Sequence, residues 1–262
     1  MEISKVLVVG LGLMGRGILQ VCAQAGFESY GYDVSEEAVK KASGHIEKSL
    51  DRRVKKGKMS EEEKAKVLGN IKTVSDLTDA KDVDLAIEAV FEDINVKQDV
   101  FRKLDQVLQP NAILASNTSA LPATPLASVT KRPEKFIIIH FHQPPTVMRL
   151  IELVRALQTS DETANIAREF CKAINKDPVE IKVDCPGFLT NRTMIPLLNE
   201  VIYCLYEGVA TKEDIDLAFK SGFNWPMGPV ELCDFIGLDT LLHIMEDLNK
   251  RRGGDKFLPC PL

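Results

Sequence analysis

Two apolar segments of the sequence each carry a side chain that could take part in proton transfer. His140 lies in the first segment, residues 135–142, just before two prolines, and Glu152 lies in the second, residues 146–154. Histidine ionises near neutrality, and an adjacent carboxylate can fix the tautomer of the imidazole and stabilise its protonated form. The two residues are therefore a candidate acid/base pair. A hydrogen-bonded imidazole at a strand end beside a solvated glutamate is the alternative interpretation.

A glycine pattern near the N-terminus could bind a dinucleotide. In such a turn the first glycine permits the tight bend, the second lets the backbone approach a pyrophosphate, and the third lets helix pack on strand. Asp33, 18 residues after Gly15 (33 minus 15), stands where a carboxylate binds ribose hydroxyls and repels a 2′-phosphate, which favours NAD over NADP. A turn needed only for packing, with Asp33 as a helix cap, is the alternative. The residues expected at the cofactor here are Gly10, Gly12, Leu13, Met14, Gly15 and Asp33.

Short β-branched runs alternate with amphipathic stretches up to about residue 183, which predicts an α/β fold with a Rossmann-like, doubly wound, mostly parallel sheet. Helices are expected over 15–24 and from Ser35 onwards. Capping-box spacings, Ser60 with Glu63 and Thr159 with Glu162, predict two further helix starts. The expected strands are 5–9, 29–32, 83–87, 112–115, 136–139, 150–154 and 179–183.

The pattern changes after the segment Asp184-Cys-Pro-Gly187, where the strands stop and helical periodicity begins. We therefore predict an NAD-binding domain over 1–184 and a smaller, all-helical domain over 185–262 that serves dimerisation and substrate binding. Pro196 should kink or break the first of its helices. The expected helices are 188–206, 211–220 and 228–250.

Composition narrows the class of protein. With 262 residues and a formal net charge of -5, the chain lacks the basic character expected of a protein that binds nucleic acid or an anionic membrane surface. Its six cysteines are scattered without C-x-x-C spacing, which favours reduced core thiols. A strand begins almost at once and no run is long enough to span a bilayer, so we expect a cytoplasmic protein.

Several motifs in order make the chain resemble the L-3-hydroxyacyl-CoA dehydrogenases, particularly the 3-hydroxybutyryl-CoA dehydrogenase type. The resemblance runs from residue 3 to about 250. Besides the glycine turn and the His140/Glu152 pair, its motifs are the segments 88–97, 116–119, 184–192 and 224–234.

The resemblance implies NAD-dependent, reversible oxidation of a 3-hydroxyacyl-CoA, with short acyl chains favoured. His140 would take the proton of the 3-hydroxyl, and Glu152 would hold the imidazole. Ser119 and Asn191 match residues that contact the substrate and position it. Loop capping for Ser119 and a helix-terminal hydrogen bond for Asn191 are the alternatives.

Further residues match the family's ligand contacts. Glu92 and Lys97 match residues at the ribose and nicotinamide side of the cofactor, which Ser119 and Gln143 would also contact. Ser49 and Lys56 match coenzyme A contacts. Ser49 lies just before the densest basic run, residues 52–58, and Lys56 lies within it. A solvated helix face would explain that run equally simply.

Two features depart from the family pattern. Where the family typically has His-Phe-Phe-Asn-Pro, this chain has His140-Phe-His-Gln-Pro144, so Gln143 replaces an asparagine and His142 a phenylalanine. His142 could join His140 and Glu152 as a metal ligand, but a loop-bonded imidazole is commoner and we expect no metal. His45 and His243 are expected to be ordinary surface or packing residues. The family also normally continues beyond residues 253–255 into a further helix.

A homodimer is expected, because the apolar face of so small a helical module needs covering. Two alternative functions remain at this point. One is a dehydrogenase of the same fold that acts on a 3-hydroxy acid or sugar acid without coenzyme A, and the other is a non-catalytic NAD-binding protein.

Overall fold

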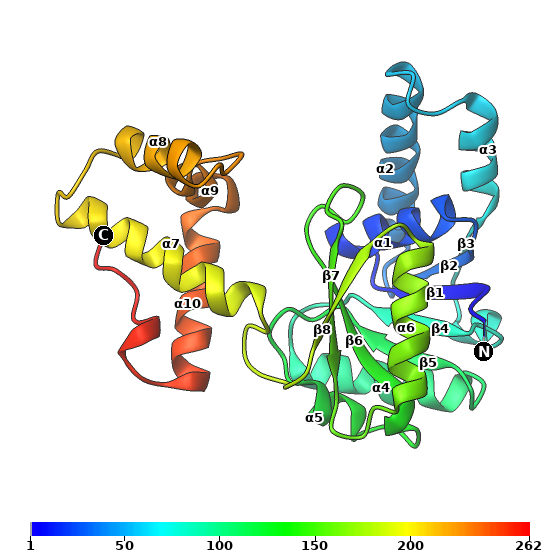
Figure 1. Cartoon of the computed structure of the whole chain (residues 1–262). Helices are drawn as coiled ribbons and strands as arrows, with labels where there is room; N and C mark the ends of the chain where they lie inside the picture. Colours follow the sequence, from blue (N-terminus) through cyan, green and yellow to red (C-terminus); the bar gives the residue numbers. More distant parts are fainter. Residues whose placement is uncertain (1) are drawn as a thin grey trace. The chain divides into compact units, whose positions relative to one another are not determined.

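The computed structural model describes residues 2–262 and separates the chain into two units, one up to Asp184 and one from Cys185 to Leu262 (Figure 1). The first unit is built on a sheet with strand order β3-β2-β1-β4-β5-β6-β7-β8, and all neighbours are parallel except β6 and β7. This topology confirms the predicted Rossmann-like sheet. The strands are β1 (Lys5–Val9), β2 (Glu28–Tyr32), β3 (Ile71–Val74), β4 (Leu85–Glu88), β5 (Ile113–Ser116), β6 (Phe136–Phe141), β7 (Leu150–Arg155) and β8 (Asp177–Ile181).

Helices cover both faces of this sheet. On one face α1, α2 and α6 share a core with strand residues such as Val8 and Ile139. On the other face Phe101 of α4 makes an edge contact with Phe136, with ring centroids 5.0 Å apart. Burial on both faces explains why the central strands are almost uninterrupted apolar runs. The helices are α1 (Leu13–Gln24), α2 (Glu36–Lys55), α3 (Glu61–Gly69), α4 (Ile94–Val107), α5 (Ala123–Ala127) and α6 (Asp161–Ala173).

The second unit is helical and has a core of its own. Its helices are α7 (Thr190–Tyr206), α8 (Lys212–Gly222), α9 (Pro229–Ile236) and α10 (Leu238–Arg252). The single helix predicted over 228–250 is wrong, because Gly237 has a φ of +95° and separates α9 from α10. Of the kink or break predicted at Pro196, the break does not occur. Helix α7 continues through this residue, since packing of the flanking Ile195 and Leu198 in the core offsets the lost hydrogen bond. None of the helices in residues 2–262 is both long enough and apolar enough to span a membrane.

Of the two capping boxes predicted from the sequence, one forms and the other does not. Ser60 and Glu63 form the predicted box at the start of α3, with bonds of 2.7 and 3.1 Å. The box predicted at Thr159 and Glu162 is wrong, because Ser160 caps α6 by accepting the backbone N–H of Thr163. The Thr159 hydroxyl instead donates to the carbonyl of Phe136 at 2.6 Å. Strand β3 was not predicted, and β8 begins two residues before its expected start, at residue 177 instead of 179.

All six cysteines are free thiols, but only Cys22, Cys171 and Cys233 are buried, so the prediction of core thiols holds for these three. Burial raises the pKa of the Cys22 thiol to about 12 and that of Cys233 to about 11, and it raises the pKa of Cys171 as well. Because the thiolate is the reactive form, these three should resist iodoacetamide at pH 8. Mass spectrometry should find native-state labelling confined to the half-buried Cys185, Cys204 and Cys260, and labelling of all six in denaturant. Early labelling of Cys22 would contradict the expectation.

Candidate active site

The antiparallel pairing of β6 with β7 places His140 directly opposite Glu152. The imidazole Nδ1 lies 2.9 Å from the carboxylate Oε2, and the two residues are only 7% and 1% exposed. An Nδ1–H donated to the carboxylate fixes the tautomer in which Nε2 is the basic nitrogen. The structure therefore brings the two predicted residues together in the arrangement that an acid/base pair requires.

His142 shares this environment. Its Nε2 lies 3.9 Å from the same Glu152 oxygen, and its ring centroid lies 4.7 Å from that of His140. Burial lowers the pKa of His142, proximity to His140 lowers it further, and Glu152 acts in the opposite direction. The net direction favours a neutral second imidazole beside the pair at neutral pH.

The glycine turn has the geometry that a dinucleotide site requires. Gly10 has a φ of +90°, in the region that favours glycine, and its N–H donates to the carbonyl of Tyr32 at 2.8 Å. A Cβ added to Gly15 would lie 1.7 Å from the carbonyl oxygen of Gly10, whereas a Cβ at Gly12 would meet no described atom within 4 Å. Gly15 is thus needed for packing, and the backbone at Gly12 is open to a ligand. The helix begins at Leu13, two residues before its predicted start.

Asp33 lies directly after β2 and reaches the glycine turn. Its Oδ2 accepts the backbone N–H of Leu11 at 2.8 Å, and its Oδ1 accepts that of Ser35 at 2.9 Å. Each carboxylate oxygen has a further lone pair that can accept a ribose hydroxyl. Of the other residues predicted in this turn, Leu13 is exposed and Met14 packs partly against the core.

Two alanine substitutions separate packing from ligand approach in this turn. Gly15→Ala should lower the free energy of unfolding by about 3 kcal/mol or more, because the methyl group overlaps a backbone carbonyl. Gly12→Ala should leave stability unchanged within about 0.5 kcal/mol but weaken NAD binding by roughly tenfold or more. Urea unfolding and calorimetric titration with NAD measure the two effects. Equal loss of stability in both variants would contradict the assignment.

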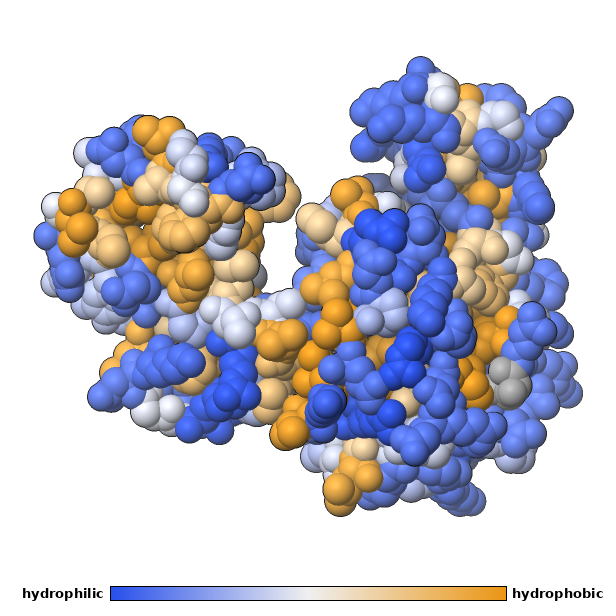
Figure 2. Space-filling view, viewed as in Figure 1, coloured by the Kyte–Doolittle hydropathy of each residue, from blue (hydrophilic) through white to orange (hydrophobic). Residues whose placement is uncertain are grey.

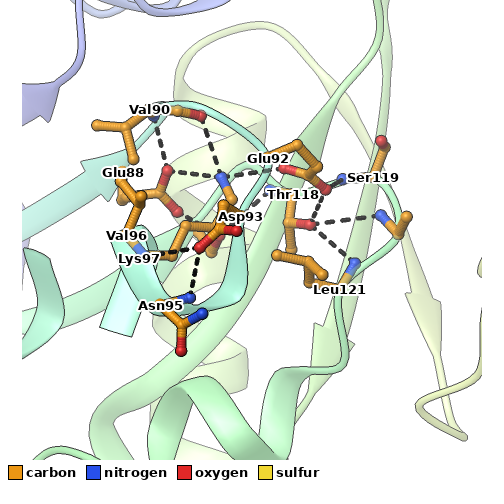
Figure 3. A network of polar contacts seen from close by, with 12 residues as sticks. Glu88, Val90, Glu92, Asp93, Asn95, Val96, Lys97, Thr118, Ser119 and Leu121 are labelled. Atoms are coloured by element: carbon orange, nitrogen blue, oxygen red, sulfur yellow. Dashed lines mark hydrogen bonds and ion pairs between the residues drawn. The ribbon is translucent and has the colours of Figure 1, made fainter. Parts of the chain in front are cut away.

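A buried ion pair joins Lys97, one of the predicted cofactor residues, to Glu88 (Figure 3). Lys97, which is 1% exposed, donates to Glu88 Oε1 at 2.7 Å and lies 3.1 Å from Glu92 Oε2. Glu88 also accepts the backbone N–H of Val90 and the hydroxyl of Ser116. Burial raises the pKa of Glu88, and its hydrogen bonds and the Lys97 charge oppose this rise. Lys97 is therefore a buried anchor that holds two carboxylates in fixed positions.

Glu92 connects this anchor to the loop that follows β5. Its Oε1 accepts the Thr118 hydroxyl and the backbone N–H of Ser119, the latter at 3.2 Å (Figure 3). The side-chain Oδ1 of Asn117 accepts the backbone N–H of Phe141 at 2.9 Å. The loop that carries Ser119 is thereby tied to the strand end that carries His140.

Three of the predicted ligand residues, Leu13, Ser49 and Gln143, line one cavity of about 200 Å³ between α1, α2 and the loop after β6. Arg16, His45 and Arg52 line it as well. Two guanidinium groups at such a cavity suit an anionic ligand. Lys56 is the exposed C-cap of α2 and does not line this cavity. Asn191, the remaining predicted residue, lies in the first turn of α7 in the second unit.

The sequence motifs did not reveal the roles of Glu88, Ser116, Asn117 and Thr118 in supporting the site. An acid that ends an apolar strand is a usable signal for Glu88, because a carboxylate in so apolar a run needs a buried partner. Nothing in the sequence indicated that Arg16 and His45 line a cavity. His45 is an exposed residue, as expected.

The glycine turn and Asp33 define a Rossmann-type dinucleotide-binding protein with the features of an NAD site. The model of the 3-hydroxyacyl-CoA dehydrogenase NAD binding domain matches residues 5–185, and the model of the C-terminal domain of the same enzymes matches residues 187–262. The chain therefore belongs to the 3-hydroxyacyl-CoA dehydrogenase family, whose members are NAD-dependent oxidoreductases that act on a CH–OH group. The non-catalytic alternative loses its support.

Individual relatives match over nearly the whole chain. The probable 3-hydroxybutyryl-CoA dehydrogenase of Bacillus subtilis (strain 168) is 46% identical over 262 residues, which cover 100% of this chain and 91% of the relative. The 3-hydroxybutyryl-CoA dehydrogenase of Bradyrhizobium diazoefficiens is 46% identical over 260 residues, covering 99% and 88%. The crystal structure of (S)-3-hydroxybutyryl-CoA dehydrogenase from Ralstonia eutropha superposes with a TM-score of 0.94 at 42% identity, covering 98% and 91%.

Proposed function

We propose that this enzyme uses NAD to oxidise the 3-hydroxyl of a 3-hydroxyacyl-CoA to the 3-oxoacyl-CoA, reversibly and with short acyl chains such as 3-hydroxybutyryl and acetoacetyl. The observation that carries the proposal is the buried contact of 2.9 Å between His140 Nδ1 and Glu152 Oε2. The names of the relatives from Bacillus subtilis, Bradyrhizobium diazoefficiens and Ralstonia eutropha support the choice of a short-chain substrate.

In this mechanism Nε2 of His140 accepts the proton of the 3-hydroxyl as the C3–H bond breaks. Bound NAD supplies the hydride acceptor. Glu152 stabilises the imidazolium that forms, and it does so from a buried position where its charge is weakly screened. In the reverse direction the imidazolium returns the proton to the 3-keto oxygen. Ser119 and Asn191 orient the oxygen atoms of the substrate.

The same proposal assigns the ligand contacts. Gly10, Gly12, Leu13, Met14 and Gly15 contact the dinucleotide through the turn, and Asp33 binds its adenosine ribose. The nicotinamide side of the dinucleotide is assigned to Glu92, Lys97, Ser119 and Gln143. For coenzyme A, Ser49 and Lys56 bind the phosphate-bearing part, and the location of Ser49 in a cavity with Arg16 and Arg52 supports this assignment.

A cytoplasmic homodimer is part of this proposal. In the second unit a largely apolar cavity of about 440 Å³ opens among α7, α9, α10 and the C-terminal residues, and apolar side chains gather on the surface of this unit (Figure 2). Exposed hydrophobic residues there include Leu189, Val209, Leu217, Phe223, Phe235, Leu238, Leu242 and Leu258. Leu238 and Leu242 of these residues line the cavity, and a second copy of the chain would cover apolar surface of this kind. A purely monomeric species in sedimentation velocity at micromolar concentration would contradict the dimer.

The activity is tested by following NADH absorbance with acetoacetyl-CoA, and in parallel with free acetoacetate at the same concentration. Oxidation of NADH only with the thioester supports the proposal. Failure to oxidise NADH with any short 3-oxoacyl-CoA would overturn it. Equal rates with the free acid would instead favour the alternative dehydrogenase that does not use coenzyme A, and NADPH in place of NADH tests the role given to Asp33.

A further inference from the structure

Three potential metal ligands meet at the ends of β6 and β7. A nitrogen of His140, a nitrogen of His142 and a carboxylate oxygen of Glu152 all lie within 4.8 Å of one another. The strand pairing fixes His140 opposite Glu152, and residues 140 and 142 project to the same side of an extended segment. Two rigid ligands are thus supplemented by a third on the segment just after the strand.

The separations suit a small tetrahedral ion. Ligand atoms around a zinc ion with bonds of about 2.0–2.1 Å lie roughly 3.3 Å apart. The oxygen of Glu152 is 2.9 Å from His140 Nδ1 and 3.9 Å from His142 Nε2, so shifts of about an ångström or less in each side chain bring the three into register. The side chain of His142 is 26% exposed while that of Glu152 is 1% exposed, so His142 gives an entering ion the more accessible of these two ligands.

The donor set also selects the kind of ion. Two imidazole nitrogens and one carboxylate oxygen form a set that binds zinc in open sites, where a water molecule occupies the fourth position. Calcium and magnesium prefer sets made of oxygen atoms alone, so they compete poorly here.

In place of the expectation from the sequence that no metal binds here, we propose that His140, His142 and Glu152 bind a zinc ion that inhibits the dehydrogenase. This inference rests on the proposed function of His140. Zinc occupies Nδ1 of His140 in place of its hydrogen bond to Glu152. A neutral imidazole bound to metal through Nδ1 carries its one proton on Nε2, so Nε2 cannot accept the proton of the substrate hydroxyl. The metal is thus a reversible inhibitor and not a cofactor, and no bond in the substrate is made or broken through it.

His142 is the residue that distinguishes this site from the acid/base pair alone. A histidine and a carboxylate by themselves supply two ligands, whereas His142 supplies the third. Where His-Phe-Phe-Asn-Pro is present, the corresponding position holds a phenylalanine, which has no donor atom. Sensitivity to zinc should therefore follow the presence of a histidine at position 142.

The experiment measures metal binding and inhibition separately on the full chain. Calorimetric titration with zinc, and the visible absorption of cobalt(II) as a probe of tetrahedral coordination, report binding without any turnover. His142→Phe keeps an aromatic ring but removes the nitrogen, and His243→Phe removes an exposed histidine of the second unit as the matched control. Each variant's rate with acetoacetyl-CoA in zinc is compared with its own rate in EDTA.

One zinc ion per chain should bind to the parent and to His243→Phe, and both should be inhibited by it. His142→Phe should bind zinc at least about tenfold more weakly and lose sensitivity in proportion. Equal zinc affinity in the parent and His142→Phe would overturn the site, and zinc bound through His142 without inhibition would overturn its inhibitory role. Metal binding that depends on His142 in a chain that never turns over acetoacetyl-CoA would contradict the proposed function while leaving the site intact.

Discussion

Replacing His140 by alanine is expected to lower kcat for NADH-dependent reduction of acetoacetyl-CoA by about 10²–10⁴-fold, the usual contribution of a general acid or base. The residue lies near the end of β6 and belongs neither to the glycine turn nor to the Glu88/Lys97 ion pair. The affinity for NAD should therefore remain within about twofold of the parent, because the substitution leaves those contacts in place. Stopped-flow measurement of NADH oxidation, with calorimetry for NAD, separates the two quantities.

Glu152→Gln provides the companion measurement. The glutamine keeps the shape and a hydrogen bond to Nδ1 but removes the charge that stabilises the imidazolium, so kcat should fall by about 10²-fold. Because the two side chains act as one unit, the double variant should be little worse than His140→Ala alone. Additive losses in the double variant, or a rate for His140→Ala within tenfold of the parent, would remove His140 from its role as the base.

This pair was predictable from the sequence because its geometry is local to two neighbouring strands. Glu152 lies 12 positions after His140, a spacing that accommodates one strand end, a proline-containing loop and the return strand. Antiparallel pairing of those strands in the register that sets residue 140 opposite residue 152 brings the two side chains close together. The glycine turn was predictable for the same reason, since its residues are consecutive and Asp33 directly follows the adjacent strand.

The hydrogen bonds that hold the loops of the site together were not predictable in this way. The contact of Glu92 with Thr118 and Ser119 joins loops 26 and 27 residues apart, and it exists only because β5 lies beside β4 in the sheet. Sequence periodicity identifies strands but not their neighbours across a parallel sheet. The failed cap at Thr159 has a similar origin, because its hydroxyl bonds to the carbonyl of Phe136, a residue of another strand.

The short strand β3 was missed for a different reason. It lies at the edge of the sheet and pairs only with β2, so two of its four residues are exposed and its apolar pattern is too weak to recognise. The break between α9 and α10 was missed because Gly237 lies within a continuous helical periodicity. Only its positive φ, which the sequence does not reveal, separates the two helices.

Replacing Lys97 by methionine is expected to have the largest effect on stability. The substitution keeps most of the side-chain volume but leaves the carboxylate of Glu88, which is 0% exposed, without its cation. Breaking a buried pair from one side typically costs about 3–5 kcal/mol, and we expect the free energy of unfolding to fall by about that amount. NAD affinity should fall as well, because Glu92 loses the ammonium group 3.1 Å from its oxygen.

The loss in Lys97→Met should depend on pH in a defined direction. Burial already raises the pKa of Glu88, and without Lys97 the pKa should rise further. Between the unfolded and the folded pKa the native state binds more protons than the unfolded state, so stability must fall as pH rises through that window. Urea unfolding should therefore show a larger deficit relative to the parent at pH 8 than at pH 5.

The double variant Glu88→Gln with Lys97→Met separates charge from packing in this network. Removing both charges leaves a neutral amide whose oxygen can accept the Val90 N–H, which in the parent lies 2.7 Å from Oε1 of Glu88. Its NH2 group can donate to the hydroxyl oxygen of Ser116, which in the parent lies 2.6 Å from Oε2. Stability should recover by about half or more of the loss and become insensitive to pH over the same range. If the double variant is as unstable as Lys97→Met at pH 8, the cost comes from lost packing around position 97 and not from an unpaired carboxylate. Recovery of stability without recovery of NAD affinity would show that Lys97 serves the cofactor through Glu92, separately from its structural pairing with Glu88.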